Sequence, residues 1–109
     1  MKNDPIVTSS SGNVFADLGF ADAEDRKARV RLAFAINQIL ERLRLPQAKA
    51  ASCLGINQPK VSALAKYRLE GFSVERLMHF LNTLGRDVEI VIHRKPRSRR
   101  AARTFVTAA

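Results

Sequence analysis

The spacing of apolar and polar residues predicts four helices followed by one strand. Apolar side chains recur every three or four residues from about residue 21 to Leu45, which indicates a first helix that stops before Pro46. Shorter helices are expected from 46 to 54, from 57 to about 67, and from 73 to 84. Their boundaries are marked by residues suited to helix ends, namely Pro46, Gly55, Asn57, Ser73 and Gly85.

Two of these helices carry an apolar face from which the core is predicted. In the first helix the apolar residues are Val30, Ala33, Phe34, Ile36, Ile39, Leu40 and Leu43. In the fourth they are Val74, Leu77, Met78, Leu81 and Leu84. Each set follows the period of an amphipathic helix, so both helices are expected to contribute to the core around the two short helices.

A change of period near residue 87 predicts a strand. In RDVEIVIHR the residues Val88, Ile90 and Ile92 alternate with Glu89, Val91 and His93. The sequence offers no second strand as a partner, and a lone strand leaves backbone groups unpaired. The simplest partner is the same segment of a second subunit. A homodimer is therefore expected, in which the strand at 87–93 pairs across a two-fold axis.

The ends of the chain differ from its middle in composition. Residues 1–13 are polar and rich in serine, which is typical of a flexible arm. Residues 14–93 form the expected domain. Residues 94–109 contain six basic residues and no acidic one, which predicts a basic disordered tail. The apolar stretch VFADLGF at 14–20 either docks on the core or anchors a partner.

Length and charge narrow the classes of function. A chain of 109 residues suits one domain with a modest core. Its formal net charge of +9 favours a polyanionic partner, nucleic acid ahead of an anionic membrane surface. No stretch approaches the roughly 18 apolar residues of a membrane span, and the N-terminal residues lack the apolar core of a signal peptide. A soluble, cytoplasmic protein without a membrane role is expected.

Residue types that carry out catalysis or bind metals are scarce. His79 and His93 are the two histidines, and neither has a neighbouring cluster of cysteines or carboxylates. A zinc site needs about four ligands at close spacing. Cys53, the single cysteine, cannot form an intramolecular disulfide and is expected to be a packed thiol. Neither a phosphate-binding glycine loop nor a nucleophile elbow occurs, so we expect no enzyme, no cofactor and no metal site.

The segment QAKAASCLGINQPKVSALAK, residues 47–66, has the residue types that two short helices crossing at a steep angle require. Ala51 is small where the helices must approach, and Gly55 allows a tight turn between them. The apolar residues expected to fill the gap are Leu54, Ile56, Val61 and Leu64. This pattern predicts a helix-turn-helix.

The segment also resembles the Cro/CI-type (Xre) helix-turn-helix family, which includes phage repressors and Cro proteins. The residues that carry the resemblance are the Pro-Gln-Ala opening at 46–48, Ala51, Gly55, Ile56 and the Gln-x-x-Val run at 58–61. In architecture it spans residues 22–85. It implies a mainly α, lambda-repressor-like helical bundle whose third helix enters the major groove of double-stranded DNA.

The resemblance implies DNA contacts for seven residues: Gln47, Asn57, Gln58, Lys60, Ser62, Ala63 and Lys66. Gln58 and Lys60 would face the bases, where glutamine suits adenine and lysine suits guanine. Ser62 and Ala63 would face the groove, and Ala63 could touch a thymine methyl group. Asn57 would cap the helix or meet a phosphate, Gln47 would grip the DNA backbone, and Lys66 would meet phosphate or a flanking base.

Alternatives to these contacts stay open. Gln58, Lys60 and Lys66 could be ordinary exposed side chains. Pro59 stands where the family commonly has glutamine or serine, which removes one base contact. The basic tail either contacts phosphates or the minor groove or is a solvated end.

A closer resemblance involves GNVFADLGFADAEDRKAR and FSVERLMHFLNTLGRDVEIVIHR. These segments look like a subgroup of small Xre-type regulators, many of which are antitoxins of HigA-like toxin–antitoxin pairs. The resemblance implies an autorepressor that binds its own operator, expected to be a palindrome, and neutralises a RelE-fold, mRNA-cleaving toxin. The alternatives are a stand-alone repressor without a toxin, or a protein-interaction module with vestigial DNA binding.

Overall fold

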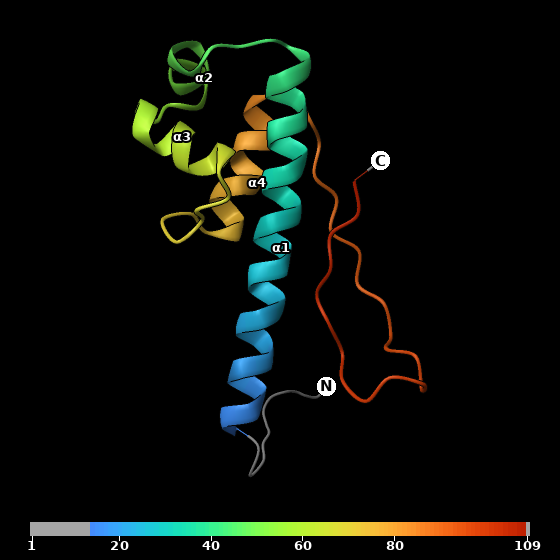
Figure 1. Cartoon of the computed structure of the whole chain (residues 1–109). Coiled ribbons are helices and arrows are strands. Elements are labelled where there is room, and N and C mark those ends of the chain that lie inside the picture. Colours follow the sequence, from blue (N-terminus) through green and yellow to red (C-terminus); the bar gives the residue numbers. More distant parts are fainter. Residues whose placement is uncertain (1–13, 109) are drawn as a thin grey trace.

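The computed structural model describes residues 14–108 of the chain, and the side chains from residue 23 onward. This part contains four helices, α1 (Val14–Arg42), α2 (Gln47–Leu54), α3 (Gln58–Ala65) and α4 (Val74–Thr83). In Figure 1 the long α1 runs along the molecule, with α2, α3 and α4 on one side of it. The segment after α4 descends on the other side. The fold is therefore the predicted helical bundle, built on one long helix.

Helix α1 begins earlier than the sequence pattern predicts. Its first residue is Val14, whereas the pattern placed the start near residue 21. VFADLGF contains no proline, and its one glycine, Gly19, costs a helix only about 1 kcal/mol, so nothing in this stretch ends the helix. The sequence left open whether residues 14–20 dock on the core or bind a partner, and these residues lie outside the part of the chain whose side chains are described.

The core lies between α1 and α4 and is closed by α3. The largest fully buried side chains are Ile36, Leu64, Leu77 and Phe80. Phe80 packs edge-on against Phe72, with ring centroids 6.0 Å apart and an interplanar angle of 75°. The pattern of the fourth helix is confirmed by Leu77 and Leu81, both of which are buried, but it left out Phe80.

The predicted face of the first helix is partly wrong. Phe34 is 51% exposed and Leu43 is 55% exposed, and Val30 is exposed as well. The buried stripe of α1 instead runs through Ala28, Leu32, Ile36, Ile39 and Leu40. Residues two positions apart lie on opposite sides of a helix, so Phe34 points away once Leu32 and Ile36 face the core.

The turn between α2 and α3 forms as the sequence predicts. Gly55 ends α2 in the left-handed conformation, with φ of 71°, and the N–H of Ile56 donates to the Ala51 carbonyl at 3.0 Å. The Asn57 side chain caps α3 by accepting from the Lys60 N–H at 2.9 Å. Ser73 caps α4 in the same way, accepting from the Arg76 N–H at 3.1 Å. Pro46 stands just before α2 as its cap residue.

Replacing Gly55 with alanine should lower the free energy of unfolding by about 1–2 kcal/mol, the cost of a left-handed residue that has a Cβ. No atom lies within 4 Å of the position that this Cβ would take, so the effect comes from the backbone alone. The matched control is Gly71→Ala, whose Cβ would lie 3.9 Å from the Lys60 Nζ at a φ that is not left-handed. Urea denaturation midpoints of the two variants check this, and equal losses would contradict it.

The segment after α4 is extended but pairs with no strand in the described part of the chain. Val88 packs against the core, whereas Ile90 is 73% exposed and Ile92 is 92% exposed. The strand predicted at 87–93 is thus not formed in this single chain, because a β-ladder needs a partner strand. Its pairing across a dimer stays a prediction.

The last described residues return to α1. Arg103–Thr107 and residues of α1 between Glu24 and Arg31 line a shared groove, and Val106 is half-buried against the core. No helix within residues 14–108 is long and apolar enough to cross a membrane.

Candidate nucleic-acid interface

Helix α3 is held with one side in the core and the other toward solvent. Val61 and Leu64 are buried, as are Ala51 and Leu54 of α2, and Ile56 packs against the same cluster. This is the packing that the sequence predicts for a helix-turn-helix. It follows that the opposite side of α3 is the side available to a partner.

The outer side of α3 is a ridge of short side chains. At 3.6 residues per turn, the positions opposite Val61 and Leu64 are Pro59, Ser62, Ala63 and Lys66. Pro59 and Lys66 are exposed, and Ser62 and Ala63 are half-buried. Such a ridge lets the helix backbone come close to a partner surface, with Lys66 as the one charged group. We call these four residues the α3 ridge.

The first turn of α3 divides the predicted contacts between two roles. The Asn57 side chain is engaged as the helix cap, so its oxygen already has a donor. Gln58, in contrast, is exposed and forms no side-chain hydrogen bond with any described residue. Gln58 therefore presents a free amide beside the α3 ridge, with both a donor and an acceptor to offer.

Lys60 lies on the flank of α3 and not on its ridge. Its Nζ is 5.6 Å from the centroid of the Phe72 ring, and the residue is half-buried. The motif alone could not indicate this, because Phe72 belongs to the turn that precedes α4. The ammonium group thus sits beside that turn, at the edge of the exposed side.

The start of α2 provides the other predicted contact. Gln47 is exposed at the first position of α2, where Pro46 supplies no side-chain cap. The first backbone N–H groups of a helix lack intrahelical partners and favour anions. Gln47, Ala48 and Lys49 are all exposed, and the first turn of α2 has no acidic residue.

The stretch from α2 to the loop after α3 carries only positive charges. From Gln47 to Leu69 the chain has no acidic residue, and its basic residues are Lys49, Lys60, Lys66 and Arg68. Lys49 and Arg68 are exposed and were missed by the motif, which does not use them. The feature of the sequence that could have indicated these two residues is the absence of carboxylates over this stretch. A surface of this kind attracts a polyanion.

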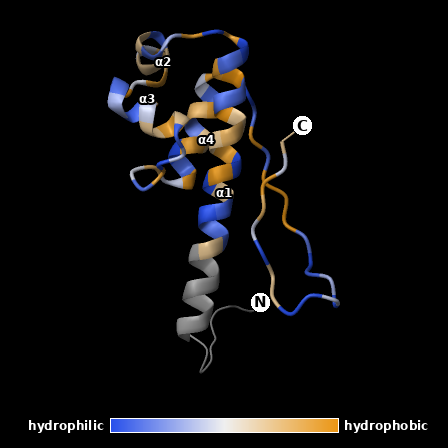
Figure 2. Ribbon diagram, viewed as in Figure 1, coloured by the Kyte–Doolittle hydropathy of each residue, from blue (hydrophilic) through white to orange (hydrophobic). Residues whose placement is uncertain are grey.

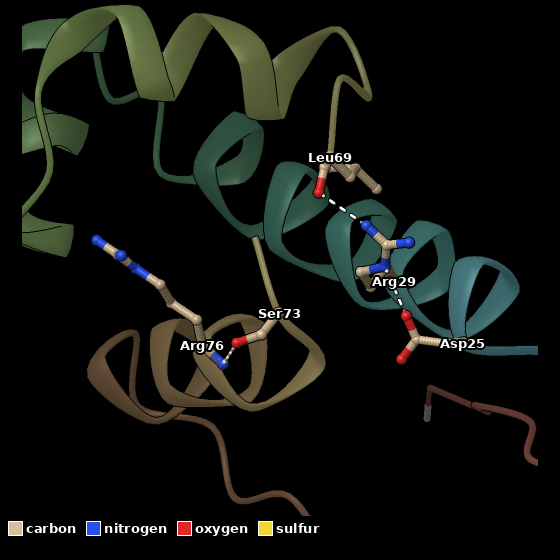
Figure 3. A network of polar contacts seen from close by, with 5 residues as sticks. All are labelled: Asp25, Arg29, Leu69, Ser73 and Arg76. Atoms are coloured by element: carbon tan, nitrogen blue, oxygen red, sulfur yellow. Dashed lines mark hydrogen bonds and ion pairs between the residues drawn. The ribbon is translucent and has the colours of Figure 1, made fainter. Parts of the chain in front are cut away.

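Two polar side chains of α1 hold the end of α3 and the loop that follows it. Arg29 donates from Nη1 to the Leu69 carbonyl at 2.9 Å and from Nε to the Asp25 carboxylate at 3.0 Å (Figure 3). Asn37 donates from Nδ2 to the Leu64 carbonyl at 3.1 Å. The sequence gives no sign of these bonds, since their partners are backbone carbonyls distant in the chain. The Asn37 bond holds α3 against α1, and the Arg29 bond holds the loop after α3 in the same way.

The described residues offer no cluster for a metal ion and a single, exposed cysteine. They contain no group of three or more His, Cys, Asp or Glu side chains that could hold a metal ion. Cys53 is exposed on α2, so the prediction of a packed thiol is wrong. Leu54, the next residue, is the one that turns inward, because adjacent helix positions point about 100° apart.

Comparisons with known proteins agree with this geometry. A family model described as a helix-turn-helix domain matches residues 14–93. A solved structure named as an XRE family transcriptional regulator is 66% identical in sequence to this chain. The match covers 81% of this chain and 99% of the solved chain, and the two structures superpose with a TM-score of 0.76. None of the curated proteins matches the chain. With this match over most of its length, the chain belongs to the XRE helix-turn-helix family.

Proposed function

We propose that this protein is a dimeric transcriptional regulator that binds a palindromic operator with α3 in the major groove. The observation that carries the proposal is the α3 ridge, which is short, free of carboxylates and backed by the core. The major groove admits a single α-helix whose outer side chains read base edges. A two-fold dimer would place two such helices on half-sites about one turn of DNA apart.

Each site residue then takes a role that its position supports. Gln58 reads a base edge with its free amide, while Ser62 and Ala63 lie along the groove, Ala63 with its methyl group toward a thymine. Gln47 at the start of α2, and Asn57 and Lys66 at the two ends of α3, hold the DNA backbone. The position of Lys60 over Phe72 favours a phosphate at the groove edge over a base.

Gln58→Ala should change sequence preference more than overall affinity. Losing a good bidentate base contact costs about 1–3 kcal/mol at the base pair concerned, and leaves phosphate contacts in place. The measurement is the affinity for an operator series with single base-pair changes, at one salt concentration. Lys49→Ala is the control, since loss of an exposed lysine should weaken all sequences alike. A Gln58 variant with the same ranking of sequences as the parent would contradict the groove assignment.

The finer proposal is that the regulator is an autorepressing antitoxin. Its support is the resemblance of LMHFLNTLGRDVEIVI to the HigA-like subgroup. The net charge of +9 limits how this could work, because an mRNA-cleaving toxin needs a basic surface of its own. Binding would then rely on local apolar contacts such as Ile90 and Ile92 more than on opposite charge.

Co-expression with the product of the adjacent gene tests the antitoxin proposal. We expect that product to arrest growth alone, and this chain to restore growth and purify with it. A double variant with Ile90→Ser and Ile92→Ser should lose the rescue. A harmless neighbour that does not co-purify would leave a stand-alone regulator, because operator binding does not depend on this result.

A further inference from the structure

The basic residues near the C-terminus form a loop between two segments that each pack one valine against the core. We call residues 94–103 the basic loop; its charged residues are Arg94, Lys95, Arg97, Arg99, Arg100 and Arg103. Before the loop Val88 packs against the core, and after it Val106 does the same. Between these anchors the loop turns back on itself, with the Arg99 N–H donating to the Pro96 carbonyl at 3.2 Å and Lys95 Nζ donating to the Arg99 carbonyl at 2.8 Å.

The basic loop lies away from α3. Figure 1 shows it beside the N-terminal half of α1, on the side opposite α2 and α3, and Figure 2 shows it as a hydrophilic stretch. The groove that holds the returning chain is lined by α1 residues from Glu24 to Arg31. The end of α3, in contrast, is bonded to Asn37, further along α1. A straight duplex bound along the α3 ridge would therefore not pass the basic loop of the same subunit.

The charge of the basic loop is not neutralised by its surroundings. None of its six basic side chains forms an ion pair with a described residue. The nearby carboxylates of α1 are already engaged, Glu24 with Lys27 at 3.4 Å and Asp25 with Arg29 at 3.0 Å. All six residues are exposed except Arg99, which is half-buried. The mutual repulsion of these charges would be relieved by a polyanion.

The chemistry of the basic loop fits phosphate. Five of the six residues are arginines, whose planar guanidinium group binds phosphate oxygens in pairs. A membrane surface fits less well, because membrane-binding segments interleave large apolar residues with their charges, and residues 94–103 contain none. The aromatic neighbour, Phe105, lies outside the basic loop and is 59% exposed, with the Arg103 guanidinium 4.6 Å from its ring centroid.

We propose that the basic loop is a second binding site for duplex DNA, so that a subunit bound to its operator through α3 captures another DNA segment on its opposite side. The loop contacts phosphates without reading sequence. The binding of an operator through α3 rests on the proposed function, whereas the binding of DNA by the basic loop does not. The result would be a regulator that bridges two stretches of DNA.

A capture experiment tests the bridge. The full chain is loaded on an immobilised operator duplex, washed, and supplied with a labelled duplex that contains no operator half-site. We expect the parent to retain the label and the variant R94Q/R97Q/R100Q to retain at least about tenfold less, since each neutralised phosphate adds strongly to affinity. Both proteins should bind the immobilised operator within about twofold. The charge-preserving variant R94K/R97K/R100K should still capture the label.

Three outcomes would overturn the proposal. One is equal capture by the parent and the glutamine variant. Another is a loss of operator affinity in the glutamine variant above tenfold, which would place the loop on the operator duplex itself. The third is retention of vesicles rich in phosphatidylserine in place of the labelled duplex.

Failure of the proposed function gives a different pattern. A parent that binds every duplex equally, with a salt dependence that drops in the glutamine variant, would refute operator reading but keep the loop as a DNA site. The expected drop is about 2–3 in the slope of log affinity against log salt concentration, at about 0.9 per phosphate. The two proposals can therefore fail independently.

Discussion

Leu64→Ala should lower the free energy of unfolding by about 2–5 kcal/mol, the range for a buried leucine that leaves a cavity. Leu64 is fully buried in α3 and belongs to the core cluster that also contains residues of α1 and α4. A domain of this size has a total stability of only about 5–15 kcal/mol, so this loss is a large share of it. The measurement is urea denaturation followed by far-ultraviolet circular dichroism.

The matched control for this substitution is Leu43→Ala. It deletes the same atoms from a side chain that is 55% exposed at the end of α1. Its cost should stay below about 1 kcal/mol, because little apolar surface is removed from the core. If the two variants unfold at the same urea concentration, the assignment of α3 to the core is wrong.

Ser62→Glu should weaken operator binding by about a hundredfold. Ser62 lies on the α3 ridge, so a carboxylate there would face the base edges and phosphates of the groove. Juxtaposing like charges across an interface costs several kcal/mol, and about 2.8 kcal/mol corresponds to a hundredfold change in affinity. Fluorescence anisotropy with a labelled operator, at fixed salt concentration, measures the effect.

The control is Ala23→Glu, which adds the same negative charge at an exposed position in the N-terminal half of α1. It should change operator affinity by less than about threefold, because separation and salt screen the charge. Both variants should unfold like the parent, which separates binding from folding. A Ser62 variant that binds as well as the Ala23 variant would show that α3 does not enter the groove.

The parts of the fold that the sequence predicts well are those governed by local chemistry. Gly55, Asn57 and Ser73 act within one turn of themselves, so their capping roles can be predicted without knowledge of the rest of the molecule. The helix-turn-helix is predictable for the same reason. Its small and apolar residues are only a few positions apart and pack against each other.

What could not be predicted depends on contacts between distant segments. The first helix has apolar residues on two sides, and only packing against α4 shows that Ile36 is buried while Phe34 is exposed. The contact between Lys60 and the Phe72 ring could not be predicted either, because Phe72 lies 12 residues further along the chain. Arg29 resembles other surface arginines of α1, because its partner is the Leu69 carbonyl, 40 residues away. The bases that Gln58 would contact depend likewise on the sequence of the bound DNA.

The exposed Ile90 and Ile92 bear on how long an unpaired chain lasts in a cell. Proteases grip their substrates as extended strands, and an unpaired, apolar strand is also a template for aggregation. A newly made subunit that meets no second copy would carry such a strand openly, with Ile92 being 92% exposed. In the dimer proposed above, pairing would cover the backbone of this strand, so the lifetime of a subunit would rise with its concentration. The amount of regulator would respond more steeply than its rate of synthesis, and scarce subunits would be removed before they could reach DNA.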